Sequence, residues 1–196
     1  APHRLPPQKI LQGLNDLLPA PVNILGVEEA PAGFHARHLA RGRSYLYVIS
    51  RVRTAFGKRY VWWVKDELDL ARMRAAAETF RGFHNFASFA DKRIDKHLST
   101  EVRIDRTDLV LRGDLIVFRI AGSHFLWKMV RRIVGIMVEA GRGRLSPAEV
   151  ERMMTSASTL PAQCTAPPSG LFLAQVLYEG DHLKPLTLPP FPFVLR

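Results

Sequence analysis

The chain has 196 residues, of which 47% are hydrophobic and 23% are charged. These proportions are ordinary for a globular protein, and the length suffices for one large domain or one domain with part of another. The 28 Lys and Arg residues outnumber the 18 Asp and Glu residues, so the net charge of +10 favours a polyanionic partner, nucleic acid before membrane. Cys164 is the only cysteine, which excludes an internal disulfide bond and a cysteine-rich metal site. No apolar run is long enough for a membrane span and no signal-peptide core begins the chain, so we expect a cytoplasmic protein.

The first forty residues predict a helix, a strand and a connector. Residues 7–18 carry apolar side chains at helical spacing, and Pro7 suits the first turn of a helix. Two prolines follow and end the pattern. Residues 22–30 favour a strand, and residues 31–42 favour a connector rich in His and Arg at its end.

The next part of the chain predicts two strands and a helix. β-Branched and aromatic residues indicate strands over 43–52 and 59–65. Asp69 is placed to cap a helix that runs to Phe80. The segment 81–93 contains three Phe at three-residue spacings between cationic residues, and we expect it to form a short helix or an ordered loop.

The second half of the chain begins with a predicted hairpin, because strand-like segments 100–111 and 114–121 are separated by Arg-Gly-Asp. Further on, Ser146 opens a capping box for a helix that ends near Ser156. The remaining elements are a loop over 157–169, a strand over 170–178 and an extended Pro-rich surface tail. From residue 43 the order is β-β-α-β-β-α-α-β. It indicates an α+β fold with a mostly antiparallel sheet and helices packed on one face.

Between the hairpin and the capping box, the segment AGSHFLWKMVRRIVGIMVEAGRG (121–143) reads as a strand end followed by an amphipathic helix. Its apolar residues fall on one half of the helical wheel. The other half holds Lys128, Arg131, Arg132 and Glu139. Gly135 lies one turn after Arg131, so the pattern predicts a gap beside the guanidinium where an anion could bind. The alternative is a charged face in contact with solvent.

No catalytic motif stands out from spacing alone, because the sequence lacks paired carboxylates, a Gly-rich phosphate loop and a Ser-His-Asp pattern. Asp108 lies within a strand-like segment, and we interpret it as a solvated strand position. An aromatic ring can stack on a base and an arginine can pair with a phosphate or carboxylate, so several side chains are candidates for lining a cleft. Core packing is the simpler explanation for each of them alone. The candidates are Tyr45, Tyr47, Phe83, Phe86, Phe89, Arg131, Gly170 and Leu171.

Five stretches in fixed order carry a resemblance to a known family. They are GLNDLLPAPVNILGVEEAPAGFHAR, RSYLYVI, LDLARMRAAAETFRGFHNFASF, LIVFRIAGSHFLWKMVRRIVGIMVEAGRG and APPSGLFLAQVLY. Through them the chain resembles the TruA family of tRNA pseudouridine synthases from about residue 9 to 178. The resemblance implies isomerisation of uridine to pseudouridine in the anticodon stem-loop of tRNA. It also implies a fold of two similar halves, a homodimer, and no metal or organic cofactor.

The resemblance also implies roles for particular residues. Tyr45 matches the tyrosine that stacks on the target uracil, and Leu171 matches the apolar residue that lines the uracil pocket. Arg131 matches the arginine that forms a salt bridge with the catalytic aspartate. We expect Lys128 and Arg132, next to these, to contact the tRNA. A guanidinium beside a carboxylate would keep it ionised, and a dry pocket would strengthen that pairing.

One family motif is missing from the sequence. The family carries its catalytic aspartate in a GRTDxGVHA-like motif, and Arg106-Thr107-Asp108 matches only three letters of it. We therefore expect residues 1–40 to be the end of the first half of the family fold, and residues 41–180 to be the second half. Residues 181–196 would be a Pro-rich tail. The expected consequence is a chain that binds RNA but does not isomerise uridine by itself. Two alternatives stay open: a non-catalytic RNA-binding module of the same fold, and a structural or protein-interaction domain.

Overall fold

The structure is a computed structural model that describes residues 5–55, 57–91, 93 and 99–186. By its internal contacts the chain divides into two compact units, one that ends at Leu39 and one that begins at Ala40.

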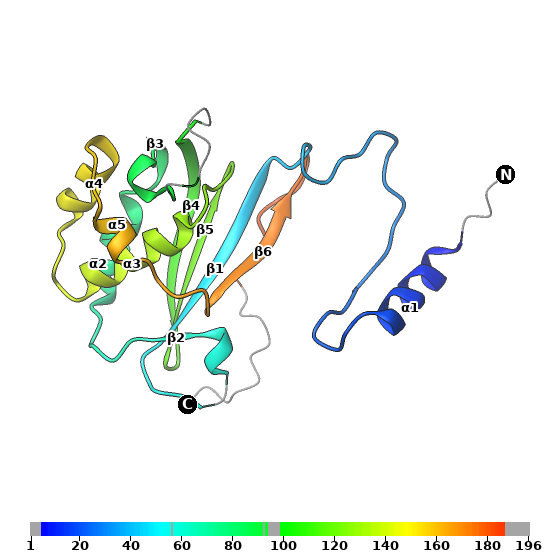
Figure 1. Ribbon diagram of the computed structural model, residues 1–196, viewed down its shortest axis with the longest axis horizontal. Helices are drawn as coiled ribbons and strands as arrows, with labels where there is room; N and C mark the ends of the chain where they lie inside the picture. The colour runs from blue at the N-terminus through cyan, green and yellow to red at the C-terminus, as the bar shows by residue number, and fades with distance from the viewer. Residues whose placement is uncertain (1–4, 56, 92, 94–98, 187–196) are drawn as a thin grey trace. The chain divides into compact units, whose positions relative to one another are not determined.

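The first unit contains one helix, α1 (Pro7–Leu17), which confirms the predicted helix (Figure 1). The predicted strand over 22–30 is wrong, since this segment has no regular secondary structure. Here the side chain of Asn15 makes the backbone hydrogen bonds that a neighbouring strand would otherwise make. It donates from Nδ2 to the carbonyl of Ile24 at 2.9 Å and accepts from the amide of Ile24 at 2.7 Å. Both backbone groups of Ile24 are thereby satisfied without a ladder.

The second unit is built on one mixed sheet, in the order β2-β1-β5-β4-β3 (Figure 1). Strand β6 pairs with β1 on the edge that it shares with β2. All pairings are antiparallel except the short one between β1 and β2. The strands are β1 (Gly42–Ser50), β2 (Trp62–Trp63), β3 (Gly82–Asn85), β4 (Glu101–Arg112), β5 (Leu115–Gly122) and β6 (Leu171–Leu177).

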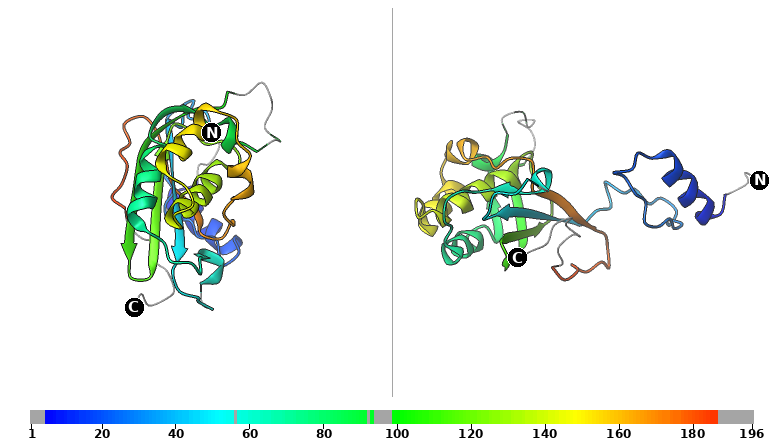
Figure 2. Two further views of the ribbon diagram at one scale, coloured as in Figure 1. Left: turned by 90° about the vertical axis from the view of Figure 1, so that its left-hand side faces the viewer. Right: turned by 90° about the horizontal axis from the view of Figure 1, so that it is seen from below.

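The α-helices of this unit cover one face of the sheet, as the two turned views of Figure 2 show. They are α2 (Leu70–Glu78), α3 (Met129–Gly141), α4 (Pro147–Thr155) and α5 (Leu160–Gln163). Asp69 caps α2 by accepting from the amides of Ala71 and Arg72, and Ser146 with Glu149 forms the capping box of α4. The predicted α+β architecture and both predicted caps are confirmed.

The side chains of β1 divide between two apolar layers. Tyr47 and Ile49 face the helices and belong to the main core, whereas Leu46 and Val48 belong to a smaller cluster on the other face. This alternation is the two-residue period of a strand covered on both sides. Leu186 packs against the smaller cluster, so the chain after β6 covers part of the helix-free face.

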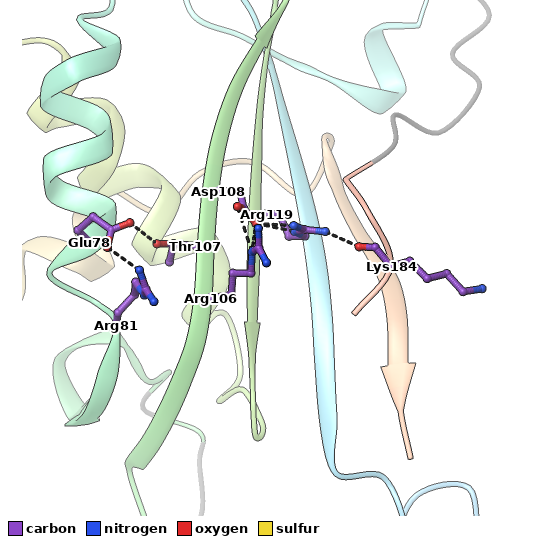
Figure 3. A network of polar contacts seen from close by, with 7 residues as sticks. All are labelled: Glu78, Arg81, Arg106, Thr107, Asp108, Arg119 and Lys184. Atoms are coloured by element: carbon purple, nitrogen blue, oxygen red, sulfur yellow. Dashed lines mark hydrogen bonds and ion pairs between the residues drawn. The ribbon is translucent and has the colours of Figure 1, made fainter. Parts of the chain in front are cut away.

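Strand β4 also directs alternate side chains to opposite faces (Figure 3). Thr107 donates to Glu78 on α2 at 3.3 Å, on the helical side. Asp108 lies on the helix-free side with Arg119, whose NH1 atom donates to the carbonyl of Lys184 at 2.7 Å. The predicted tail therefore lies along the sheet as far as it is described, and residues 187–196 lie outside the described residues.

Several predicted elements need correction. The strand predicted over 59–65 is reduced to β2 behind the 3₁₀ helix η1 (Lys58–Tyr60), because β6 occupies most of that edge of β1. The segment 81–93 contains β3 as well as the 3₁₀ helix η2 (Ala87–Phe89), since pairing with β4 stabilises an extended backbone there. The loop predicted over 157–169 contains α5. Within the described residues, no helix has both the length and the apolar character needed to cross a bilayer.

Candidate active site

A pocket of about 340 Å³ opens between β1, the start of α3 and the start of β6. It brings together Tyr45, Lys128, Arg131 and Leu171, which were predicted as site residues from three places in the sequence. Phe125, Leu126, Trp127, Met129, Val130 and Pro168 complete the lining. No Asp or Glu of the described residues lines this pocket, hereafter the Tyr45 pocket.

Tyr45 is half-buried on the helical side of β1. Its ring meets the ring of Phe125 edge-on, with centroids 5.2 Å apart and planes at 81°. This is a favourable aromatic geometry that fixes the ring orientation. The Tyr45 hydroxyl has no hydrogen-bond partner among the described residues, so both the ring and the hydroxyl can contact a bound molecule.

Arg131 is tied to the chain segment opposite it. Its Nε atom donates to the carbonyl of Ala166 at 2.6 Å, and its own carbonyl accepts from the amide of Ala166 at 3.1 Å. The two terminal guanidinium nitrogens have no hydrogen-bond partner among the described residues, so they keep donors for an anion. The arginine is thus oriented by one bond, with the rest of its donors available.

The gap predicted beside Arg131 at Gly135 is wrong. A Cβ atom at Gly135 would lie 1.6 Å from the carbonyl oxygen of Cys164, so the chain segment before β6 fills the space. The glycine serves the close approach of two backbones. Anion binding at Arg131 would use the Tyr45 pocket and not a space on the helix surface.

The segment that carries Leu171 is held by two further contacts. The Tyr47 hydroxyl donates to the carbonyl of Pro167 at 2.8 Å, and burial raises the pKa of Tyr47 although Arg131 opposes the shift. Gly170 has φ of +95°, and a Cβ there would lie 2.6 Å from the carbonyl of Val48. Tyr47 is therefore a core residue that keeps its proton, and its function in the site is to fix the pocket wall.

Lys128 adopts a left-handed backbone conformation with φ of 63°, as no other non-glycine residue among those described does. This conformation is uncommon for a lysine and needs support from its surroundings. It ends the loop before α3, so the helix begins at Met129. The Lys128 ammonium lies 2.8 Å from the carboxylate of Asp91, which provides that support.

Asp91 is the centre of a group of cations. Its side chain is 9% exposed and contacts Arg93 at 3.0 Å and Lys128 at 2.8 Å. The hydrogen bonds from Arg93, and then from Lys128, hold the pKa of Asp91 well below its usual range. The amide of Asp91 also donates to the carbonyl of Trp127 at 3.2 Å. Sequence analysis missed this residue, although a lone acidic residue beside cations in ADKR was a usable signal.

Arg132 does not lie where the helical wheel placed it. It is 6% exposed, it donates from NH1 to the carbonyl of Ala90, and its NH2 atom lies 3.9 Å from Asp91. It lines a different cavity, of about 350 Å³, between η2 and α5. Burial lowers the pKa of its guanidinium, with Asp91 opposing the shift. The predicted contact of Arg132 with tRNA therefore has no support from the Tyr45 pocket.

The other candidate residues lie away from the Tyr45 pocket. Phe86 and Phe89 are fully buried in the core with Phe80, while Phe83 is exposed on β3. Asp108 is not a free solvated carboxylate, because it is partly buried and paired with two arginines. Partial burial opposes them, but Arg106 and Arg119 hold the pKa of Asp108 below its usual range.

The strand register separates Asp108 from the pocket. Tyr45 and Thr107 are both paired with Ile120, whereas Asp108 is paired with Arg119. Since paired residues share a face of the sheet, Tyr45 and Asp108 lie on opposite faces. Asp108 is thus unable to serve the Tyr45 pocket in this fold.

Within the described residues, no group of three or more His, Cys, Asp or Glu side chains could hold a metal ion.

Comparison with known proteins identifies the relatives of this chain. The sequence model of the family described as tRNA pseudouridine synthase matches residues 76–179. The chain is 36% identical to tRNA pseudouridine synthase A of an Exiguobacterium species over 176 residues, 89% of this chain and 71% of that protein. It is 37% identical to the protein of the same name from Geobacter sulfurreducens, over 89% of this chain and 72% of the relative. With that of Thermotoga maritima it shares 35% identity over 180 residues, 89% and 72% of the two chains.

Proposed function

Because this chain belongs to the tRNA pseudouridine synthase family, we propose that its Tyr45 pocket receives the uracil ring of a tRNA uridine that is to become pseudouridine. The observation that carries the proposal is the convergence of Tyr45, Arg131 and Leu171 on one pocket from β1, α3 and β6. The reaction class is isomerisation, and the substrate class is tRNA.

Each of the three side chains fits one part of this task. Tyr45 offers a flat ring for an unstacked base and a hydroxyl near its edge. Leu171 and the neighbouring apolar side chains exclude water, which strengthens every charge interaction in the pocket. Arg131 presents guanidinium donors to an anion and is oriented by its bond to Ala166.

The reaction moves one bond of the base without net loss or gain of atoms. The bond from uracil N1 to the ribose C1′ breaks, the freed ring rotates within the pocket, and a bond from its C5 atom to C1′ forms. The proton on C5 leaves and N1 ends protonated. Tyr45 and Leu171 would hold the detached ring, and Tyr45, which carries the only hydroxyl among the described lining residues, would assist in proton removal.

A carboxylate is still required as the group that reacts at the ribose or base. None of the described residues provides one in the pocket, and Asp108 lies on the other face of the sheet. We therefore extend the proposal: Arg131 pairs with an aspartate from a part of the family fold other than these residues, and the 196-residue chain binds tRNA without isomerising it.

The test is a pseudouridine assay with this chain on an unmodified tRNA transcript, read by mass spectrometry, alongside binding at several salt concentrations. The expected result is no product together with binding that weakens steeply as salt rises. Formation of product would contradict the inactivity, and Asp108→Asn would then be the first variant to assay. Absence of binding at low salt would contradict the tRNA site itself.

A second candidate function is a non-catalytic RNA-binding module of the same fold. It is favoured by the absence of a carboxylate among the described lining residues. The gene sequence upstream of the codon for Ala1 separates the two. An in-frame GRTD motif supports the enzyme, whereas an upstream sequence without one supports the module.

The family relationship also extends the proposal to a homodimer of the full-length protein that acts in the cytoplasm. Light scattering after size-exclusion chromatography of that protein tests the first part, and a mass of one subunit would contradict it. Subcellular fractionation tests the second.

A further inference from the structure

The segment 51–65 (RVRTAFGKRYVWWVK) carries five cations and no acidic residue. All five side chains are exposed, and none of them forms an ion pair within the described part of the chain. Elsewhere on the surface, arginines such as Arg72, Arg81 and Arg144 pair with acidic neighbours within 3.5 Å. The five cations are Arg51, Arg53, Lys58, Arg59 and Lys65, and we call the stretch 51–65 that carries them the unpaired basic segment.

This segment borders a cavity of about 820 Å³, which has Arg53, Lys58, Trp63 and Ser169 among its lining residues and no acidic residue of the described chain. The ring of Trp63 is 39% exposed, and the guanidinium carbon of Arg53 lies 5.7 Å from its centroid. An exposed aromatic face beside cations is the combination that binds single-stranded nucleic acid, because the ring stacks on a base and the cations meet phosphates.

The cavity and the Tyr45 pocket flank the same short chain segment. Ser169 lines the cavity, while Pro168 and Leu171 line the Tyr45 pocket. Between them Gly170 packs so tightly that a Cβ atom would lie 2.6 Å from Val48 O and 3.3 Å from Trp62 N. Ser169 directly follows Pro168, and only Gly170 separates it from Leu171, so the two linings meet within four consecutive residues whose Cα atoms are about 3.8 Å apart from one to the next.

From this placement we propose that the cavity at Trp63 binds a second nucleotide of the RNA strand whose uracil enters the Tyr45 pocket. Trp63 stacks on the base, and Arg53 with Lys58 contacts the phosphates beside it. The inference rests on the proposed function for the strand that it follows, but the nucleotide site has its own residues. A protein partner at this surface would have to supply several carboxylates to the unpaired basic segment.

The first test measures the affinity of the 196-residue chain for a fluorescently labelled uridine tetranucleotide. Trp63→Ala is expected to weaken binding about 5- to 100-fold, the range that loss of one stacked base gives. Trp63→Phe keeps a ring and should stay within about threefold of the unchanged chain. Phe83→Ala is the matched control, because Phe83 is an exposed aromatic on β3 at the opposite edge of the sheet. Equal affinities for Trp63→Ala and Phe83→Ala would overturn the proposal.

A second test avoids any change of folding, since it alters only exposed cations. Lys58→Gln should lower the slope of log affinity against log salt by about 0.7, the contribution of one single-strand phosphate contact. Arg152→Gln removes an exposed cation from α4, which contacts β3 at the opposite end of the sheet from β2, and should leave the slope unchanged. An unchanged slope for Lys58→Gln would remove the phosphate contact from the proposal.

Tyr45→Ala on the same tetranucleotide separates this inference from the proposed function. If Tyr45→Ala leaves the affinity unchanged while Trp63→Ala weakens it, the uracil pocket fails and the nucleotide site stands. If Tyr45→Ala weakens binding and Trp63→Ala does not, the uracil pocket stands and the second site fails.

Discussion

Two buried arginines on opposite sides of the sheet have nearly the same exposure and very different surroundings. Arg119 is 5% exposed on the helix-free face, and Arg132 is 6% exposed on the helical face. Arg119 donates to Asp108 at 2.6 and 2.8 Å and to the carbonyl of Lys184 at 2.7 Å (Figure 3). Arg132 donates to the carbonyl of Ala90 and lies 3.9 Å from Asp91, and its buried Nε has no hydrogen-bond partner among the described residues.

The difference lies in what each carboxylate serves. Asp108 is shared by Arg119 and an exposed Arg106, so the buried partner receives its closest contacts. Asp91 makes its closest contacts with Lys128 and Arg93, and the buried Arg132 has only a longer contact with it, at 3.9 Å. A buried donor without a partner is rare and needs an explanation. Here the Asp91 carboxylate stabilises the left-handed conformation of Lys128 at the Tyr45 pocket, and Arg132 is left with the weaker contact.

The largest effect that this comparison predicts follows from Arg119→Met. The change leaves Asp108 partly buried with only an exposed arginine, and it frees the carbonyl of Lys184. Removal of one partner of a buried salt bridge costs about 3–5 kcal/mol of unfolding free energy, and we expect the lower end because Arg106 remains. Urea unfolding followed by circular dichroism measures it.

The control for Arg119→Met is Arg106→Gln, which alters an exposed partner of the same carboxylate. An exposed pair contributes up to about 1 kcal/mol. Equal losses for the two variants would show that burial of Arg119 has no energetic weight. RNA affinity should be the same for both, since Asp108 and Tyr45 lie on opposite faces of the sheet.

The contrast between the two arginines was not predictable from the sequence. A helical wheel gives the angle of Arg132 about the axis of α3, and charge then suggested exposure. The structure covers that side of α3 with η2 and α5, which are distant in sequence, so the side chain is buried. Likewise, the gap at Gly135 could not be excluded, because the segment that fills it belongs to another part of the chain.

Local signals performed better where the stabilising contact is itself local. Asp69 and Ser146 bond amides within three residues, so their caps could be predicted from neighbouring letters. The hairpin between β4 and β5 is equally local, with Gly113 at φ of 54° in its turn. Strand β3 was missed because it depends on pairing with β4. The Tyr45 pocket was assembled from sequence only through a family resemblance, since no periodicity relates Tyr45 to Leu171.

The next effect concerns Asp91→Asn and depends on pH. In the folded chain the pKa of Asp91 lies below its unfolded value of about 3.9, because the carboxylate is bonded to Arg93 and Lys128. The ionised form thus contributes stability that is fully present above pH 4 and is lost as the pH falls through the folded pKa. At pH 7 we expect Asp91→Asn to be less stable than the unchanged chain, with a smaller loss of unfolding free energy than Arg119→Met causes. At pH 3 the difference in unfolding free energy between Asp91→Asn and the unchanged chain should be smaller.

Urea unfolding at the two pH values checks this expectation, with Asp105→Asn as the control. Asp105 also pairs with one arginine, but its side chain is half exposed and serves no buried group. A constant gap between pH 7 and pH 3 for Asp91→Asn would mean that the loss arises from packing and not from charge. The same variant should bind RNA with a steeper salt dependence, because Lys128 is then released for a phosphate.

The smallest effect, and the sharpest contrast with Arg119, is expected for Arg132→Met. Methionine fills a similar volume, removes the buried Nε that no described residue contacts by a hydrogen bond, and leaves Asp91 with its two closest cations. Because Asp91 keeps these two partners, the change leaves no buried carboxylate unpaired, and the loss expected for breaking a buried salt bridge does not apply. We therefore expect the unfolding free energy to change by no more than about 1 kcal/mol. A buried polar atom without a partner carries a desolvation cost, and methionine removes that cost. A loss of unfolding free energy as large as that of Arg119→Met would show that Arg132 is a full ion-pair partner of Asp91 despite the 3.9 Å distance. The unequal sharing of the Asp91 carboxylate would then have no energetic consequence.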